Sequence, residues 1–174
     1  MQCSVFVGVS LDGFLARPDG ALDFLPQTPE PHGYEEFVAT IDAFVWGRKT
    51  YDFVQGYGTW FHGTKPVFVL SSNELRPPPA GGVVERMSGH PAEIVAALEA
   101  RGIRHVYVDG GVTIQQFLRA GLIQRLIITH IPVLIGEGVP LFGPLDGDIV
   151  LTHVSTRQFP SGMVQTEYAV ATQG

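Results

Sequence analysis

Short runs of β-branched and other apolar residues recur along most of the chain, and each of them predicts a strand. These runs cover residues 5–9, 43–46, 66–70, 83–86, 105–108 and 125–134. Between them, apolar residues recur at helical spacing, which predicts helices at 33–41, 91–100 and 111–120 and a further one after Gly47. Two more strands are predicted at 149–154 and 163–171.

The order of these elements predicts the fold class. Strands alternate with helices as far as residue 134, and only strands follow. Such an order is typical of an α/β protein with a mainly parallel central sheet, antiparallel C-terminal strands and helices on both faces. The length of 174 residues fits a single domain spanning 1–174.

Composition and charge narrow the range of partners. The chain is 45% hydrophobic and carries 11 basic against 17 acidic residues, a net charge of −6. Long contacts with nucleic acid or anionic membranes need clustered cations, so we expect neither partner. Cys3 is the single cysteine, so the chain needs no oxidising compartment. The sequence also has neither a signal-peptide pattern nor a long apolar run, and we therefore expect a cytoplasmic location. No spacing of His, Cys and carboxylates suggests a metal site.

Three predicted strands end in loops with phosphate-binding chemistry. Val-Asp-Gly-Gly-Val-Thr at 108–113 places paired glycines before a helix, whose free N–H groups attract anions. Gly-Arg-Lys-Thr at 47–50 places two cations at another helix start, and Leu-Ser-Ser-Asn at 70–73 supplies hydroxyl groups. Each loop alone is equally compatible with a tight turn or a solvated helix start. Ligands of open α/β sheets bind at such strand ends, so the three together predict a cofactor site.

In order and context, these loops resemble those of dihydrofolate reductase and its relatives, over nearly the whole chain. The resemblance implies a three-layer dihydrofolate reductase-like fold and an NADPH cofactor. NADPH rather than NADH is also favoured by the cations and hydroxyls of Arg48, Lys49, Ser71 and Ser72. The resemblance to this family also implies which residues contact the cofactor: Gly8, Leu15, Ala16, Gly47, Arg48, Lys49, Thr50, Leu70, Ser71, Ser72, Gly110, Gly111, Val112, Thr113 and Ile114.

Two features differ from a true folate reductase. Thr28 stands where that enzyme keeps a carboxylate on its first helix. In addition, Ser-Leu-Asp-Gly at 10–13, Asp109 before the glycine pair and the long motif at 131–142 resemble another branch. That branch contains the reductase domain of the bifunctional riboflavin-biosynthesis deaminase-reductase and its stand-alone relatives. No deaminase segment with paired zinc-ligand cysteines is present.

The resemblance implies hydride transfer to a pteridine-, pyrimidine- or riboflavin-precursor-like heterocycle, and this reaction also needs a proton. Asp23 and Asp109 are candidate carboxylates on the substrate side, although Asp109 is also suited to helix capping. Thr129 is a candidate substrate contact. Genuine dihydrofolate reductase and a non-catalytic nucleotide-binding protein are the alternatives. A homodimer is expected, with the apolar strand at 126–134 and the loop after it as its interface.

Overall fold

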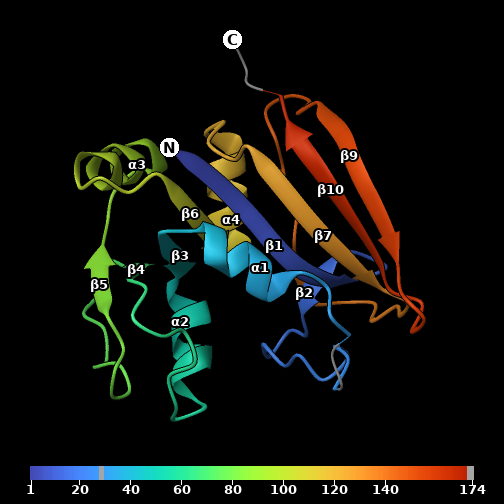
Figure 1. Cartoon of the computed structure of the whole chain (residues 1–174), viewed down its shortest axis with the longest axis horizontal. Helices are drawn as coiled ribbons and strands as arrows, with labels where there is room; N and C mark the ends of the chain where they lie inside the picture. Colours follow the sequence, from blue (N-terminus) through green and yellow to red (C-terminus); the bar gives the residue numbers. More distant parts are fainter. Residues whose placement is uncertain (28–29, 172–174) are drawn as a thin grey trace.

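A twisted eight-stranded sheet forms the centre of the computed structural model, which describes residues 1–27 and 30–171 (Figure 1). Its strands lie in the order β5 (Val84–Met87), β4 (Val67–Leu70), β3 (Ala43–Gly47), β6 (His105–Asp109), β1 (Gln2–Ser10), β7 (Arg125–Ile131), β10 (Val164–Val170) and β9 (Leu151–Gln158). The first six are parallel, whereas β10 runs antiparallel to β7 and β9 antiparallel to β10. This confirms the predicted fold class.

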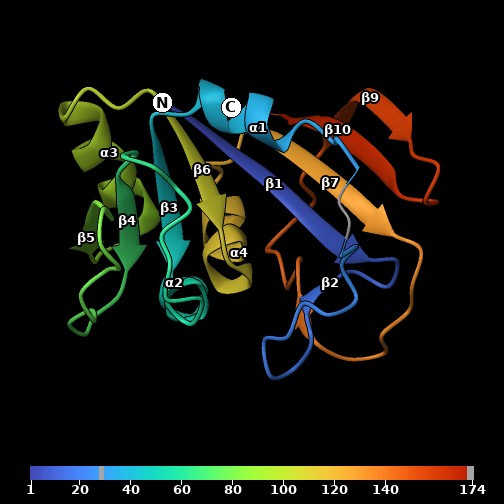
Figure 2. The same ribbon diagram turned by 60° about the horizontal axis from the view of Figure 1, so that its bottom comes forward.

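Helices cover both faces of the sheet, as predicted. Helices α1 (Tyr34–Thr40) and α2 (Arg48–Gln55) pack on one face against an aromatic cluster that includes Phe6 and Tyr107. Helices α3 (Pro91–Ala100) and α4 (Gly111–Arg119) pack on the other against an aliphatic core. The alternation of side chains along the strands separates the two cores, because successive residues point to opposite faces. Figure 2 shows α1 and α4 on either side of β6 and β1.

The remaining strands form a small second sheet that the apolar pattern does not predict. It pairs β2 (Phe14–Ala16) with β8 (Val139–Pro140). Segments of three and two residues are too short to show a periodic signal. The small sheet lies below the C-terminal end of β1 (Figure 2) and ties the loop after β1 to the loop after β7.

The strand predicted to reach residue 134 ends at Ile131 instead. Pro132 follows, and proline has no N–H to continue a ladder of hydrogen bonds. The part of the predicted dimer interface that falls on this strand is also wrong. Strand β7 lies inside the sheet between β1 and β10, and Leu126 and Ile128 are buried in the chain's own core. Throughout the segments that the structure describes, no helix is long and apolar enough to cross a bilayer.

Candidate active site

The three loops predicted from the sequence meet at one edge of the sheet. Strands β3, β4 and β6 are parallel neighbours, so their carboxyl ends lie side by side. Gly47 pairs with Leu70, and Trp46 pairs with Asp109. The Gly47, Leu70 and Gly110 loops therefore line one continuous edge, which we call the cofactor edge.

Glycines let the loops of the cofactor edge approach one another closely. Gly110 has a φ of +104°, and a Cβ there would lie 2.8 Å from the Thr50 hydroxyl oxygen. A Cβ on Gly47 would lie 2.7 Å from the Thr113 hydroxyl oxygen. Real Cβ atoms do not approach other atoms this closely, so a side chain at either position would force the Thr113 or Thr50 hydroxyl to move. The positive φ of Gly110 favours glycine there in addition.

Both helix starts at this edge leave their backbone donors open. Helix α2 begins after Gly47 and α4 after Gly110, and neither has a side-chain cap. The N–H groups of a first helical turn have no partner within the helix and carry a partial positive charge. Two such starts side by side, with no Cβ in the way, fit the pyrophosphate of a dinucleotide.

Cations gather at the neighbouring loop after β4. The Arg48 guanidinium donates to the Ser71 hydroxyl oxygen at 3.3 Å and to the carboxylate of Asp52 at 3.0 and 3.1 Å. Arg86, which the sequence analysis missed, donates to the Ser71 carbonyl oxygen at 3.2 Å. Two guanidinium groups therefore contact one serine, beside the start of α2.

The small sheet closes the other side of α4. A Cβ on Gly111 would lie 2.9 Å from a Val139 methyl group and 3.5 Å from a Leu15 methyl group. A Cβ on Gly138 would lie only 2.2 Å from the Ala16 carbonyl oxygen, so β8 can pair with β2 only with glycine there. The long motif at 131–142 therefore holds the Leu15–Ala16 segment against the start of α4.

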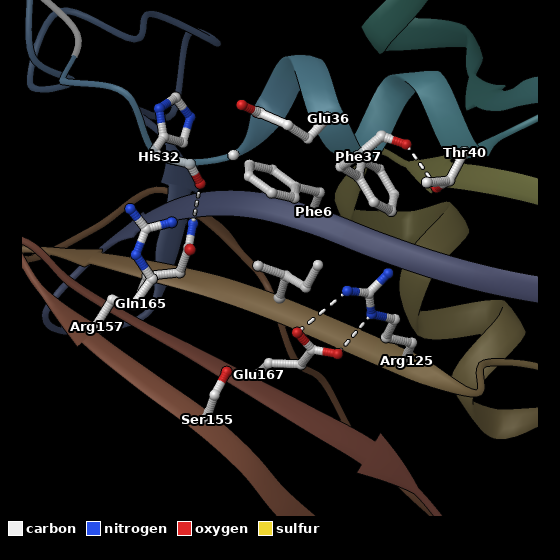
Figure 3. A pocket seen from close by; sticks show the side chains of 12 residues that line it. Phe6, His32, Glu36, Phe37, Thr40, Arg125, Ser155, Arg157, Gln165 and Glu167 are labelled. Carbon is white, nitrogen blue, oxygen red and sulfur yellow. Dashed lines mark hydrogen bonds and ion pairs between the residues drawn. The ribbon is translucent and has the colours of Figure 1, made fainter.

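A groove runs over the face of the sheet covered by α1. It consists of two adjoining cavities of about 280 and 220 Å³, both of which border Phe6 and His32. The inner cavity is bordered by Gly8, Leu25, Pro26, Thr129, Ile131 and Met163. The outer cavity, shown in Figure 3, is bordered among others by Phe37, Arg125, Arg157, Gln165 and Glu167. Aromatic walls and a few convergent polar groups suit a flat heterocycle.

Polar side chains in the groove come from β7 and β10, next to Gly8 of β1. Gly8, Thr129 and Gln165 lie opposite one another on β1, β7 and β10. Gln165 donates from its amide nitrogen to the His32 carbonyl oxygen at 2.9 Å and to the Thr129 hydroxyl oxygen at 3.0 Å. Nearby, Arg125 donates to both carboxylate oxygens of Glu167, at 2.7 and 3.1 Å (Figure 3).

Asp109 is a carboxylate at the cofactor edge. It ends β6, and its carboxylate accepts the N–H of Gly110 at 2.8 Å. Burial raises the pKa of Asp109 from 3.8 to about 6, although the Gly110 N–H opposes this rise. A carboxyl group with such a pKa holds a proton in mildly acidic solution and can release it near neutrality.

Comparisons with known proteins assign the chain to a family. Residues 3–165 match the family described as the RibD C-terminal domain. The uncharacterized protein YwjB of Bacillus subtilis is 30% identical over 96% of this chain and 97% of its own length. The crystal structure of a protein from Shewanella sp. PV-4, described as a riboflavin biosynthesis protein, has a TM-score of 0.90. The two sequences are 36% identical, over 98% of this chain and 99% of the Shewanella chain.

The chain belongs to the RibD C-terminal domain family. More distant structures show the same fold. The deaminase and 5-amino-6-(5-phosphoribosylamino)uracil reductase of Thermotoga maritima has a TM-score of 0.74 at 13% identity. This chain covers 56% of that longer protein, and 98% of this chain is matched. Dihydrofolate reductase of Enterococcus faecalis has a TM-score of 0.64 at 18% identity, with 97% of this chain and 96% of that chain covered.

In this member of the RibD C-terminal domain family, the structure brings most of the predicted site residues together. Gly8 and Thr129 lie in the groove, Leu15 and Ala16 lie in β2, and the Gly47, Leu70 and Gly110 loops form the cofactor edge. Lys49 and Ser72 are exposed near that edge, and Val112 is 63% exposed at the start of α4. Ile114 differs: its side chain is buried in the core and its N–H donates to the Gly110 carbonyl oxygen.

Asp23 is not brought to the groove. Its side chain is 62% exposed and accepts a hydrogen bond from Arg17 at 2.6 Å. That guanidinium lowers the pKa of Asp23, so the group stays ionised and is a poor proton donor. Thr28, whose lack of a carboxyl group argued against a folate reductase, lies outside the described residues.

Gln165 is one of the groove residues that sequence reasoning missed, together with Phe6, His32 and Phe37. It stands in β10, and neither its strand pattern nor any motif distinguishes it from a structural polar residue. Gln165 reaches the groove only because β10 pairs with β7, which places it opposite Thr129. Arg86 was missed for a similar reason, because β4 and β5 had to be paired before it could reach Ser71.

Proposed function

We propose that this protein is an NADPH-dependent reductase that transfers a hydride to a pteridine-, pyrimidine- or riboflavin-precursor-like heterocycle. The observation that carries the proposal is the pair of uncapped helix starts at the cofactor edge. The aromatic groove lies on the same sheet, where β1, which carries Phe6 and Gly8, is the neighbour of β6. Membership of the RibD C-terminal domain family supports a reductase of this kind.

In this proposal the cofactor edge holds the dinucleotide. The first-turn N–H groups of α2 and α4 bind its pyrophosphate, with Gly47, Thr50, Gly110, Gly111, Val112 and Thr113 around it. Arg48, Lys49, Arg86, Ser71 and Ser72 bind the additional phosphate of NADPH, because guanidinium groups and hydroxyls suit a dianion. Gly8, Leu15 and Ala16 lie against the nicotinamide.

When bound, the cofactor supplies a hydride, and the chain's own residues orient the acceptor and deliver the proton. Phe6 stacks on Phe37 with ring centroids 5.1 Å apart and lies 5.5 Å from the His32 ring, so these side chains form one wall against which the heterocycle lies. Thr129 contacts its polar edge at the inner cavity. Asp109 is the assigned proton source, since its raised pKa lets it carry a proton at the end of β6.

Cofactor binding is the direct test. Trp46 is buried at the end of β3 beside Trp60, so tryptophan fluorescence reports on this edge. NADPH is expected to quench it with an affinity about tenfold higher than that of NADH. The Arg86→Gln variant should bring the two affinities close together. No fluorescence change at millimolar NADPH would contradict the proposed cofactor.

We also propose a homodimer, formed by the free edge of β9 instead of β7. All eight residues of β9 are exposed, and Val150 and Val154 beside and within it are 66% and 54% exposed. In the portion of the chain described, no strand pairs with its outer edge. Long edge strands are normally covered or protected by charged side chains and prolines, and β9 has Arg157 but no lysine or proline. Antiparallel pairing of two copies of β9 would cover both edges.

A further inference from the structure

Thr129 carries a hydroxyl hydrogen for which the residues that the structure describes offer no acceptor. Its oxygen accepts a hydrogen bond from the Gln165 amide nitrogen at 3.0 Å. A threonine hydroxyl has one hydrogen to donate, and among the described residues no acceptor receives it. Thr129 is only 3% exposed, and it borders the inner cavity.

The orientation of Gln165 follows from its second partner. The same amide nitrogen donates to the His32 carbonyl oxygen at 2.9 Å. A carbonyl oxygen can only accept, so the nitrogen must face His32 and Thr129, and both of its hydrogens are used. Gln165 is itself 7% exposed, so bulk water does not compete with this arrangement. Thr129 is therefore held as an acceptor toward Gln165 and as a donor toward the cavity.

From this network we infer that Gln165 is a specificity-determining residue that makes Thr129 a hydrogen-bond donor to the substrate. The inference rests on the proposed function, because it deepens the description of the same groove. The fitting substrate is an oxo-heterocycle, whose ring carbonyl oxygen accepts from the Thr129 hydroxyl. An amino group at that ring position presents hydrogens of its own and leaves the buried donor unpaired, which disfavours its binding.

A matched pair of probes tests this specificity. Pterin and 2,4-diaminopteridine differ at one ring position, which carries an oxo group in the first and an amino group in the second. Ligand-observed NMR at neutral pH, with NADPH present, gives the dissociation constant of each. The unaltered protein is expected to bind pterin at least about tenfold more tightly. No binding of pterin, or equal binding of the two probes, overturns the inference.

Variants of the two residues separate specificity from stability. Thr129→Val removes the donor at constant shape and should bring the preference to about one, whereas Thr129→Ser should retain it. Gln165→Glu places a carboxylate that accepts the Thr129 hydrogen, so pterin binding should weaken while 2,4-diaminopteridine binding changes little. Thr152→Val, on exposed β9, is the matched control and should preserve the preference.

Measurements on the same protein variants distinguish failure of the Gln165 inference from failure of the cofactor proposal. NADPH binding is measured by fluorescence in each variant, and Thr129→Val and Gln165→Glu are expected to leave it unchanged. If NADPH binds and the pterin preference survives Thr129→Val in a folded protein, the inference on Gln165 fails while the cofactor proposal stands. If NADPH does not bind to the unaltered protein, the cofactor proposal fails, and the probe affinities measured without it still test Thr129.

Discussion

At the scale of single residues, two carboxylates that look alike in the sequence differ in their surroundings. Asp23 is exposed beside Arg17, whose positive charge lowers its pKa. Asp109 lies at the end of β6, where burial raises its pKa to about 6. Loss of hydration disfavours the charged form, whereas a neighbouring cation favours it. Environment rather than residue type therefore makes Asp109 the group able to hold a proton.

This difference predicts the effect of pH on the stability of Asp109→Asn. The folded state binds more protons than the unfolded state between the pKa values of 3.8 and about 6, so Asp109 destabilises the protein progressively as the pH rises through this window. The amide of the variant carries no charge and should increase the free energy of unfolding by about 1–2 kcal/mol at pH ~8, with little effect at pH ~3. Urea denaturation at the two pH values measures this. A variant less stable at the higher pH would show that Gly110 and other partners outweigh burial.

At the scale of elements, the site depends on turns that interlock rather than on one motif. The starts of α2 and α4 are held together by Gly47 and Gly110, and β8 is held on β2 by Gly138. Each contact joins segments that are far apart in the sequence. A Cβ would meet the backbone of another segment at Gly138 and a threonine hydroxyl of another segment at Gly47 and Gly110. The close approach, and not merely a turn of the chain, therefore favours glycine at these positions.

Two glycine substitutions separate these causes. Gly110 and Gly102 both have positive φ, but a Cβ on Gly102 meets nothing within 4 Å. Gly102→Ala should cost only the strain of the left-handed conformation, about 1 kcal/mol, and retain NADPH binding. Gly110→Ala should cost about 2–4 kcal/mol and weaken NADPH binding at least about tenfold, because Thr50 must move. Thermal denaturation and fluorescence titration measure both effects, and equal losses in the two variants would rule out the close approach as the cause.

At the scale of the whole molecule, the sheet has one long edge strand without a partner among the described residues. Strand β5 at the opposite edge has only four residues, whereas β9 has eight. The order of the strands places β9 next to β10, which carries Gln165. A dimer through β9 would therefore form beside the groove, which Ser155 and Arg157 of β9 also border.

Light scattering tests the dimer. The unaltered protein should have a mass about twice that of the 18.9 kDa chain. Val154→Lys, which places a charge on the β9 edge, should give the mass of one chain and retain the fold. Leu134→Lys, at an exposed apolar position on the loop after β7, is the control and should leave the dimer intact. A monomeric unaltered protein at high concentration would refute the proposed interface.

The sequence by itself determined the elements and the cofactor edge. Apolar periodicity predicted the strands of the main sheet and the helices that cover it. Helix α3 begins and ends where the pattern predicts. Loops with paired glycines, cations and serines could be recognised locally because their chemistry lies within a few consecutive residues. The parallel order of the strands then made those loops neighbours.

Only the tertiary structure decided the groove. Gln165 reaches His32 and Thr129 across 133 and 36 residues of sequence, and no local pattern encodes such contacts. The structure likewise showed that β7 is internal and that β9 is a long edge strand without a partner among the described residues, which is why we propose β9 as the interface. Local patterns specify what each segment can form, but burial and pairing depend on which segments become neighbours. The pKa of Asp109 and the donor role of Thr129 arise from that arrangement.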